Sequence, residues 1–352
     1  MNSLNFVNED WPLVERSSRS PHATLWRDLF RYAGKDLSER LFLRPAADPD
    51  FHKSFTNALT LADDMIAAWE NVDDPFAGLV LLYYGALWLG NAVALCSLNG
   101  SVLRRRRATH GLGVSIAPEE PRPFLNGKID FGSDEESFGT INLAMGGGSL
   151  AGRTPSVADL LQALPEMGSS LKHLGLQCAA IELTARDSRQ DESDVLVVSP
   201  AMLAGVVTDD TISEGWLRDH LAVFDGLRER GLTVAAGYDG RHIVWHRLRD
   251  PSDSRWLPDS AELRAVAIPF ARRHYLLPKI KRVAVSEYAI YLAILYSLGH
   301  LARYYPDYWI NMQRDRTEEF FLIEDFLDIA EDKVPNLILN HLSRHTNVYR
   351  SS

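Results

Sequence analysis

Apolar residues form one continuous stretch from Phe76 to Leu98, FAGLVLLYYGALWLGNAVALCSL, in which no residue is charged. Asp73, Asp74 and Pro75 come directly before it. An aspartate N-cap followed by a proline in the first turn predicts the start of a helix. Apolar side chains would lie on every side of this helix, which is typical of the central helix of a bundle or of a membrane span.

Two features of this stretch favour the central helix. Tyr83, Trp88 and Asn91 lie in its middle, whereas the aromatic anchors of a membrane span lie at its two ends. Gly85 and Gly90 would let neighbouring helices approach closely. We therefore expect a buried helix and no membrane insertion, with a membrane anchor as the alternative.

Other segments show the three-and-four spacing of apolar residues that predicts amphipathic helices. These predicted helices cover residues 21–33, 51–70, 286–305, 317–330 and 334–345. Ser286 and Thr317 stand at the N-cap positions of two of them. Residues 1–20 are polar and are expected to be irregular, and residues 306–311 are expected to form a turn around Trp309.

The middle of the chain is rich in Gly, Pro and Ser, and its short alternating segments predict strands. The predicted strands are 128–131 with 137–145 as one hairpin, 177–185, 194–199, 232–236 with 241–248 as a second hairpin, and 265–270, and helices are expected after Ser156 and over 213–230. The pattern predicts an α+β fold. We expect a mainly helical bundle formed by residues 1–110 and 281–352, with residues 111–280 as a β-rich insertion.

Composition and charge limit the classes of protein to which this chain could belong. The chain has 352 residues and a net charge of −10, so it is a poor generic binder of naked nucleic acid. Basic residues nevertheless cluster at 104–107, 241–249 and 272–282. Cys96 and Cys178 lie in apolar runs, which indicates two reduced, buried thiols. The first residues lack the pattern of a signal peptide, and we expect a cytoplasmic protein.

Several segments resemble a known family. The buried stretch followed by THGLGV, then PFLNGKIDFG and TPSVADLLQALPEM, is similar to the YaaC-like family of bacterial proteins. The block from YLAILYSLGHLARYYPDYW to DFLDIAEDKVPNLILNHL resembles the closing helices of that family. The resemblance covers roughly residues 50–352. It rests on apolar and aromatic positions, and the family is largely of unknown function.

The same stretch also resembles, more distantly, the helix pair of HEPN-type domains, which are common in toxin–antitoxin and antiviral systems. Many of these domains are RNases that use an Arg and a His four to six residues apart on a helix. Arg105 and His110 have this spacing, and Arg104 lies one residue further away. Gly111 and Gly113 follow, so the sequence departs from the pattern by placing His110 at a helix end or in a loop.

The resemblance implies metal-independent RNA cleavage. His110 would act as the general acid and base, Arg105 would stabilise charge on the phosphate, and the remaining arginines of the run, Arg104, Arg106 and Arg107, would contact nucleic acid. The alternative is a basic helix end, because cations stabilise the C-terminus of a helix. Arg241 and His246 show the same spacing in a predicted strand, so the spacing has low specificity.

Other motifs point to chemistry only weakly. His242 with His246 and His341 with His345 are four residues apart, but no third ligand is near, so we expect no metal. Residues 146–149, GGGS, lack the ending of a phosphate-binding loop and predict a flexible connection. Tyr304, Tyr305, Tyr308 and Trp309 are expected to pack at the edge of the helical core or to form a recognition surface.

These observations lead to two functional hypotheses. The first is a nucleic-acid-linked component of a bacterial defence or toxin-type system, acting as a HEPN-like RNase that needs no cofactor, binds RNA or another nucleic acid, and forms a homodimer. The second is a non-catalytic subunit that binds a protein partner. The sequence leaves open whether the protein is an enzyme.

Overall fold

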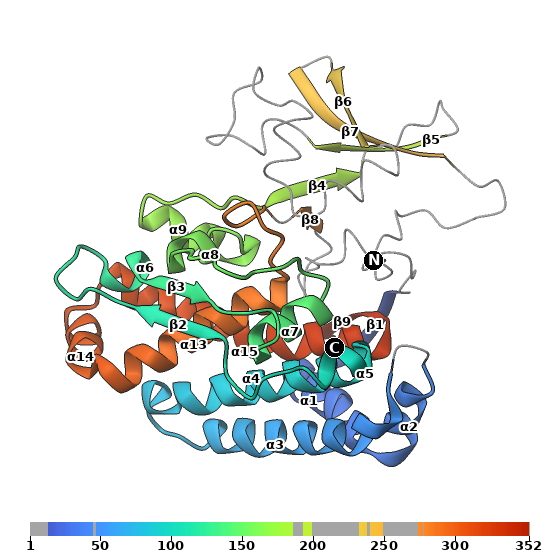
Figure 1. The fold of residues 1–352 in the computed structure, drawn as a ribbon. Helices are drawn as coiled ribbons and strands as arrows, with labels where there is room; N and C mark the ends of the chain where they lie inside the picture. Colours follow the sequence, from blue (N-terminus) through green and yellow to red (C-terminus); the bar gives the residue numbers. More distant parts are fainter. Residues whose placement is uncertain are drawn as a thin grey trace.

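The computed structural model describes residues 13–44, 47–185, 193–198, 232–237, 240–248, 274–276 and 278–351 (Figure 1). Within them the fold is α+β, with most of the regular structure in helices and a smaller antiparallel sheet. The predicted helix over 213–230 and the predicted strand over 265–270 lie outside the described residues.

The described helices are α1 (Pro21–Phe30), α2 (Lys35–Phe42), α3 (His52–Glu70), α4 (Pro75–Ser97), α5 (Gly100–Leu103), α6 (Pro123–Asn126), α7 (Ser137–Ala144), α8 (Val157–Leu161), α9 (Gly168–His173), α13 (Glu287–Tyr304), α14 (Pro306–Asp315) and α15 (Glu318–Ser343). Short 3-10 turns are η2 (Arg31–Ala33), η3 (Pro49–Phe51) and η4 (Pro165–Met167). The described strands are β1 (Leu13–Ser18), β2 (Leu112–Ser115), β3 (Lys128–Phe131), β4 (Ile181–Ala185), β5 (Ser193–Val198), β6 (Leu232–Gly237), β7 (Gly240–Leu248), β8 (His274–Leu276) and β9 (Thr346–Ser351).

Helix α4 is the apolar stretch that the sequence singles out, and it lies at the centre of the helical part. The Asp74 carboxylate accepts from the Phe76 N–H at 3.0 Å and Pro75 occupies the first turn, as predicted. Helix α3 packs along one side of α4 and α13 along another. A Cβ added to Gly85 would lie 2.6 Å from the side chain of Ile66 of α3, so a larger residue there would displace Ile66.

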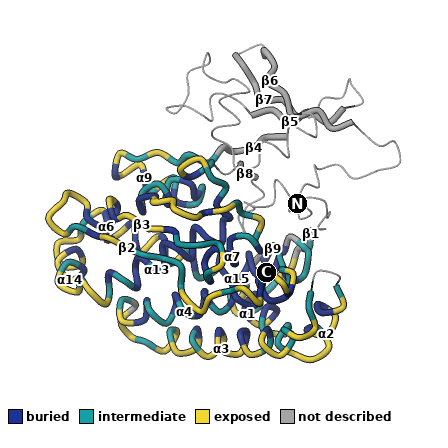
Figure 2. Tube along the Cα trace, in the orientation of Figure 1, coloured by how far each residue is buried: buried dark blue, intermediate teal, exposed yellow. Residues whose placement is uncertain are grey.

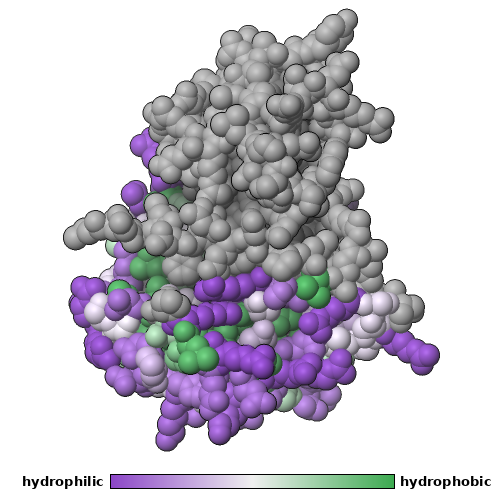
Figure 3. All heavy atoms as spheres, turned by 90° about the vertical axis from the view of Figure 1, so that its right-hand side faces the viewer, coloured by the Kyte–Doolittle hydropathy of each residue, from purple (hydrophilic) through white to green (hydrophobic). Residues whose placement is uncertain are grey.

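Among the long helices, α4, α13 and α15 are the most buried, whereas α3 exposes its outer face (Figure 2). Among the described residues one helix, α4, is long and apolar enough to cross a membrane, and 72% of its most apolar window is buried by the rest of the protein. On the face shown in Figure 3, hydrophilic residues surround smaller hydrophobic areas.

Described segments from the first and last parts of the chain pack together. Helix α1 packs on α15, and β1 pairs with β9 in parallel, with Leu13 opposite Thr346. Tyr349 of β9 donates to the Asp28 carboxylate of α1 at 2.9 Å. The prediction that residues 1–20 are irregular is therefore wrong for β1, because its partner strand lies at the far end of the chain and leaves no local periodicity.

Residues 137–145, predicted as a strand, form helix α7 instead. The partner of β3 is β2, and the two strands pair antiparallel with Leu112 opposite Phe131. A short apolar run does not distinguish a buried strand from a buried helix. Helix α7 is buried on nearly every side against α4 and α13, which explains why its sequence shows no clear helical period.

Two predictions near the C-terminus also need correction. Residues 306–311, expected as a turn, begin helix α14, in which Pro306 occupies the first turn. The two helices expected over 317–330 and 334–345 are one helix, α15, which continues through Pro335. Thr317 caps it, because its hydroxyl accepts from the Phe320 N–H at 3.2 Å.

The remaining strands form one antiparallel sheet in the order β6-β7-β5-β4-β8, which lies beyond α8 and α9 in Figure 1. Strands β6 and β7 form the predicted hairpin, with Gly237 opposite Gly240. Between this sheet and the helices, α8 packs on α13 and α9 packs on α15. Ser156 caps α8 as expected, in a capping box with Asp159.

Candidate functional site

A cleft of about 630 Å³ lies between α3, α4 and the segment that follows α5. Its lining combines apolar and aromatic side chains with two arginines and a histidine, and it contains no aspartate or glutamate. The lining residues are Phe51, Ser54, Met65, Tyr84, Leu87, Trp88, Asn91, Leu95, Leu103, Arg106, Arg107, Ala108, Thr109, His110 and Ser137. For a chain with a net charge of −10, this cleft is locally basic.

The segment 104–110 is fixed by the start of α7. Helix α5 is a single turn capped by Asn99, whose side chain accepts from the Ser101 N–H at 2.7 Å. The Ser137 N–H donates to the Thr109 carbonyl and the Phe138 N–H donates to the His110 carbonyl, both at 3.0 Å. The first N–H groups of a helix have no partner inside the helix, and here the loop carbonyls supply it.

Gly111 turns the chain sharply after His110. Its φ is +73°, and an added Cβ would lie 2.7 Å from the Cβ of Glu136. Glu136 accepts from the Thr109 hydroxyl at 2.8 Å and from the Ser133 N–H at 2.6 Å, and these hydrogen bonds lower the pKa of its carboxyl. Glu136 therefore holds Thr109, and with it the loop that carries His110, next to the start of α7.

His110 lies in a loop, within a cage of tyrosines. Its Nδ1 lies 2.7 Å from the hydroxyl of Tyr83, and its ring centroid lies 5.6 Å from that of Tyr84 and 6.2 Å from that of Tyr296. Burial lowers the pKa of His110, and the positive charge of Arg303 lowers it further. The imidazole is therefore neutral at pH 7.

Arg106 is half-buried in the cleft and is held by neutral groups. Its Nη2 donates to the side-chain oxygen of Asn91 and, at 2.9 Å, to the hydroxyl of Ser137. Among the residues that the structure describes, no carboxylate pairs with it. Burial lowers the pKa of the guanidinium, which still stays charged near neutral pH. The result is a positive charge without a counter-charge, facing a cleft.

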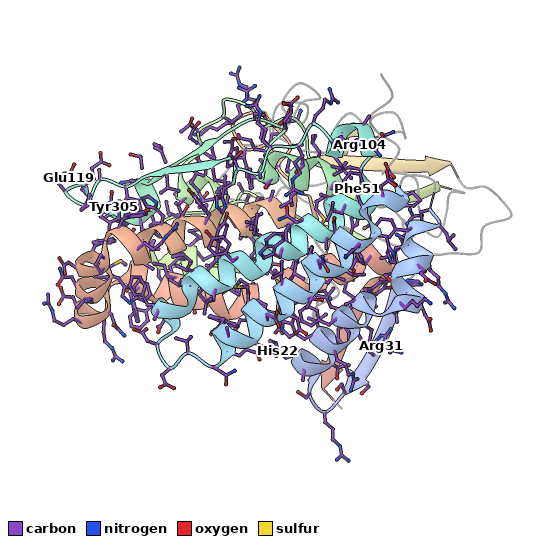
Figure 4. All side chains as sticks on the ribbon, turned by 60° about the horizontal axis from the view of Figure 1, so that its bottom comes forward. His22, Arg31, Phe51, Arg104, Glu119 and Tyr305 are labelled. Atoms are coloured by element: carbon purple, nitrogen blue, oxygen red, sulfur yellow. The ribbon has the colours of Figure 1, made fainter. Side chains whose placement is uncertain are left out.

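The other arginines of the run point elsewhere. Arg104 forms ion pairs at 2.9 Å with both Asp48 and Asp50, and its guanidinium lies over the ring of Phe51 (Figure 4). Arg105 is exposed, donates to the Ser101 carbonyl at 3.3 Å and does not line the cleft. The structure thus places Arg106 and His110 in one cleft and leaves Arg104 and Arg105 outside it.

Arg107 lies at the rim of the cleft and is exposed, with its guanidinium 3.6 Å from the Glu135 carboxylate. Its charge is therefore partly neutralised, unlike that of Arg106. The backbone N–H of the same residue donates to the Glu135 carbonyl at 2.8 Å. Arg107 thus contributes more to the position of the loop than to the charge inside the cleft.

His110 and Arg106 contact α4 at two different positions. Tyr83 holds His110 and Asn91 holds Arg106, and these two residues of α4 are separated by about 12 Å along the helix axis, from the rise per residue. The cation that acts electrostatically on His110 is instead Arg303 of α13. Arg303 is exposed and has no carboxylate partner among the described residues.

Sequence reasoning did not find Tyr83, Asn91 or Arg303 as site residues. Tyr83 and Asn91 interrupt an otherwise apolar helix, and a polar side chain in such a helix is a signal that it faces something polar. Arg303 lies far along the chain and gives no local signal at all.

Other predicted sites have structural roles where the structure describes them. His341 is hydrogen-bonded to the Ser97 hydroxyl at 2.9 Å, and burial lowers its pKa to about 3. No group of three or more metal-binding side chains occurs in the described part of the chain. The N–H groups of Gly147 and Gly148 each donate to a backbone carbonyl at 2.8 Å, so they are not open to a phosphate. The side chains of His242 and His246 lie outside the described residues.

The aromatic cluster around Pro306 packs at the edge of the core. Trp309 stacks on Phe76 with ring centroids 4.5 Å apart, and the Tyr305 hydroxyl donates to the Ile116 carbonyl at 3.2 Å. The Tyr308 hydroxyl donates to the Glu319 carboxylate at 2.6 Å. Tyr304 differs from these three, since 62% of its surface is exposed.

Comparisons with known proteins find a family but no individual relative. No curated protein and no solved structure matches the chain. The model of the YaaC-like protein family matches residues 47–342, a span that includes α3, α4, the loop with His110 and most of α15. The protein therefore belongs to the YaaC-like family.

Proposed function

We propose that this protein is a nucleic-acid-linked protein that binds RNA through the cleft beside α4. The observation that carries the proposal is the charge of Arg106, which is half-buried and which, among the described residues, is held by Asn91 and Ser137 in a cleft whose lining contains no carboxylate. A guanidinium in this state gains most from an anion that brings two oxygens, and phosphate is such an anion.

RNA cleavage at His110 is the enzymatic form of this proposal. The tyrosine hydrogen bond fixes the imidazole and is compatible with both tautomers, so the other nitrogen can accept or donate a proton. In the reaction, a ribose 2′-hydroxyl gives its proton to the base and its oxygen attacks phosphorus. The bond to the 5′ oxygen breaks, and that oxygen takes up a proton from water while His110 releases its proton to the solvent, which leaves a 2′,3′-cyclic phosphate and a 5′-hydroxyl.

In this mechanism the two arginines have different tasks. We assign to Arg303 the stabilisation of charge on the reacting phosphate, because its positive charge acts on His110. Arg106, which is held by Asn91 two turns after Tyr83 on α4, binds a neighbouring part of the RNA and holds it in the cleft. Arg105, which the sequence spacing favours, has no task here because it points to the Ser101 carbonyl.

The wider biological setting follows from the resemblance. We place the protein in the cytoplasm, off the membrane, as a HEPN-like component of a bacterial defence or toxin-type system that acts as a homodimer. Residues 1–110 with 281–352 would form the helical bundle and residues 111–280 its insertion. The packing of α3 and α13 on α4 supports this division, because it joins helices from both ends of the chain.

RNA binding tests the proposal directly. Fluorescence anisotropy with a labelled single-stranded RNA compares wild type, Arg106→Gln and the neighbouring Arg105→Gln. We expect Arg106→Gln to weaken binding about tenfold or more and Arg105→Gln to change it about twofold at most. Equal effects of the two substitutions would show that the cleft is not the binding site. Cleavage that persists in His110→Ala would remove the catalytic assignment.

A non-catalytic, partner-binding subunit is the second candidate. Three exposed apolar side chains favour it: Tyr304 of α13, Ile310 of α14 and Phe321 of α15, which are 62%, 54% and 40% exposed. They come from three helices that contact one another. Light scattering of wild type and Ile310→Glu tests this surface. A dimer that becomes a monomer only in the variant supports it, and an unchanged mass excludes it as the surface between copies.

A further inference from the structure

We infer that the cleft takes one nucleotide unit, with its phosphate on Arg106 and its base against the aromatic wall formed by Tyr84 and Trp88. This inference rests on the proposed binding of RNA and names the part of RNA that the cleft selects. The volume of about 630 Å³ falls within the range of about 300–1,000 Å³ that is typical of small-ligand pockets.

The aromatic wall and the charge lie along one face of α4. Tyr84, Trp88 and Asn91 follow one another at helical spacings of four and three residues, so they form a single stripe, and all three line the cleft. Trp88 lies about 5 Å along the helix axis from Asn91, the residue that holds Arg106. This offset puts a flat surface beside the charge, as a base lies beside its own phosphate.

The rest of the cleft is suited to a flat, largely uncharged body. Met65 of α3 and Leu87, Leu95 and Leu103 complete the apolar walls, and no carboxylate is present to repel a phosphate. Stacking on aromatic side chains tolerates every base because each base has a π face. The cleft is therefore expected to select for the presence of a base more than for its identity.

Two kinds of phosphate can satisfy Arg106: that of a free nucleoside monophosphate and that of a nucleotide at the end of an RNA strand. Both carry the same chemistry. A 5′-phosphorylated RNA hexamer and adenosine 5′-monophosphate are therefore the two main probes, measured by isothermal titration calorimetry against the full chain.

Three fragments divide the nucleotide into its parts. Adenosine lacks the phosphate, ribose 5-phosphate lacks the base, and inorganic phosphate lacks both. We expect the monophosphate to bind about tenfold more tightly than each fragment. Ribose 5-phosphate or adenosine binding as tightly as the monophosphate would overturn the inference, because the cleft would then lack a base site or a phosphate site.

Variants assign the contacts. Arg106→Gln should reduce monophosphate affinity about tenfold while leaving adenosine affinity unchanged. Trp88→Ala should reduce monophosphate affinity by a similar factor, and Trp88→Phe should restore most of it, since the smaller ring still stacks. Circular dichroism confirms that each variant is folded. If Trp88→Phe and Trp88→Ala both bind like wild type, the base does not lie on this wall.

The outcomes separate the inference from the proposed function. If the hexamer binds with a dependence on Arg106 but the monophosphate does not bind, RNA binding stands and the single-nucleotide site falls. If the monophosphate binds and no RNA does, the nucleotide site stands and the proposed RNA function falls. If neither binds, both fall.

Discussion

The hydroxyl of Tyr83, in the middle part of the apolar helix α4, lies 2.7 Å from Nδ1 of His110. Burial raises the pKa of the Tyr83 phenol far above its usual value, so the phenol keeps its proton at every physiological pH. A buried hydroxyl needs a partner, and His110 is the one it has. The histidine is thus oriented by α4 and not by its own loop alone.

The substitution Tyr83→Phe should therefore leave the His110 ring without its fixed orientation. The loss of one hydrogen bond is expected to lower the free energy of unfolding by about 1 kcal/mol. The proposed cleavage activity should fall as the ring loses its fixed orientation. Tyr296→Phe is the matched control, because the Tyr296 ring also lies against His110 but no hydrogen bond to its hydroxyl occurs in the described part of the chain. Equal effects of both variants would contradict an orienting role for Tyr83.

Arg303→Gln should raise the pKa of His110. Burial and the charge of Arg303 both lower this pKa, so removing the charge leaves only the larger effect of burial, and the pKa moves part of the way back. Because Arg303 is exposed, added salt should raise the pKa of wild type in the same direction. The measurement is the NMR titration of the His110 ring protons, with Arg105→Gln as the control. If the titration curve of His110 is the same in Arg303→Gln as in wild type, this arginine does not act on the site.

Gly111→Ala should distort the loop that carries His110. The substitution combines an unfavourable positive φ with a clash, because the new Cβ would lie 2.7 Å from Glu136. Gly175→Ala separates the two effects: Gly175 has a φ of +70° but no atom within 4 Å of an added Cβ. The unfavourable backbone conformation should lower the free energy of unfolding by about 1 kcal/mol in both variants. The clash with Glu136 should lower it further in Gly111→Ala alone. Thermal unfolding compares them, and equal losses would mean that Glu136 moves aside freely.

Several helix starts could be predicted from local patterns. Asp74, Ser156, Ser286 and Thr317 all cap helices where the sequence places them, because a cap is a contact within three residues. Helix α7 could not be predicted, since it is buried on nearly every side by elements distant in the chain. Strands β1 and β9 could not be predicted either, because each is a strand only by pairing with the other, which lies at the opposite end of the sequence.

The residues of the candidate site also divide into those that local sequence patterns predict and those that they do not predict. The sequence singles out the run from Arg104 to Arg107 and His110, and the structure places part of that set in a cleft. Which arginine points inward depends on the single turn of α5 and its Asn99 cap, and four adjacent arginines look alike in a sequence. The contact of His110 with Tyr83 spans 27 positions, which is beyond any local spacing rule.

A buried charge cluster away from the cleft gives the protein a pH-dependent stability. Lys333 of α15 is 1% exposed, and its ammonium lies 2.6 Å from the Glu166 carboxylate and 2.8 Å from that of Glu287. Tyr291 lies one turn after Glu287 on α13, and its hydroxyl is buried. Two carboxylates thus share one ammonium in a place closed to water, which disfavours the ionised form of the more buried of them.

Burial raises the pKa of Glu287 from 4.5 to about 8, although Lys333 opposes this. The folded chain therefore keeps a proton that the unfolded chain loses above pH 4.5, and the stability from this proton falls as the pH rises from about 4.5 to 8. Glu287→Gln, which cannot ionise, should remove most of this fall. Urea unfolding at pH 5, 7 and 9 measures it.

The comparison at pH 5 is the internal control, because the side chain at position 287 is neutral in both folded proteins there and ionises in the unfolded wild type only near this pH, so the two stabilities should be close. At pH 9 the variant should be the more stable of the two. Lys333→Met should instead lose about 3–5 kcal/mol near pH 7, since it leaves the buried Glu166 carboxylate without its cation. If wild type and Glu287→Gln lose stability in parallel from pH 5 to 9, Glu287 is ionised throughout and the ammonium of Lys333 outweighs burial.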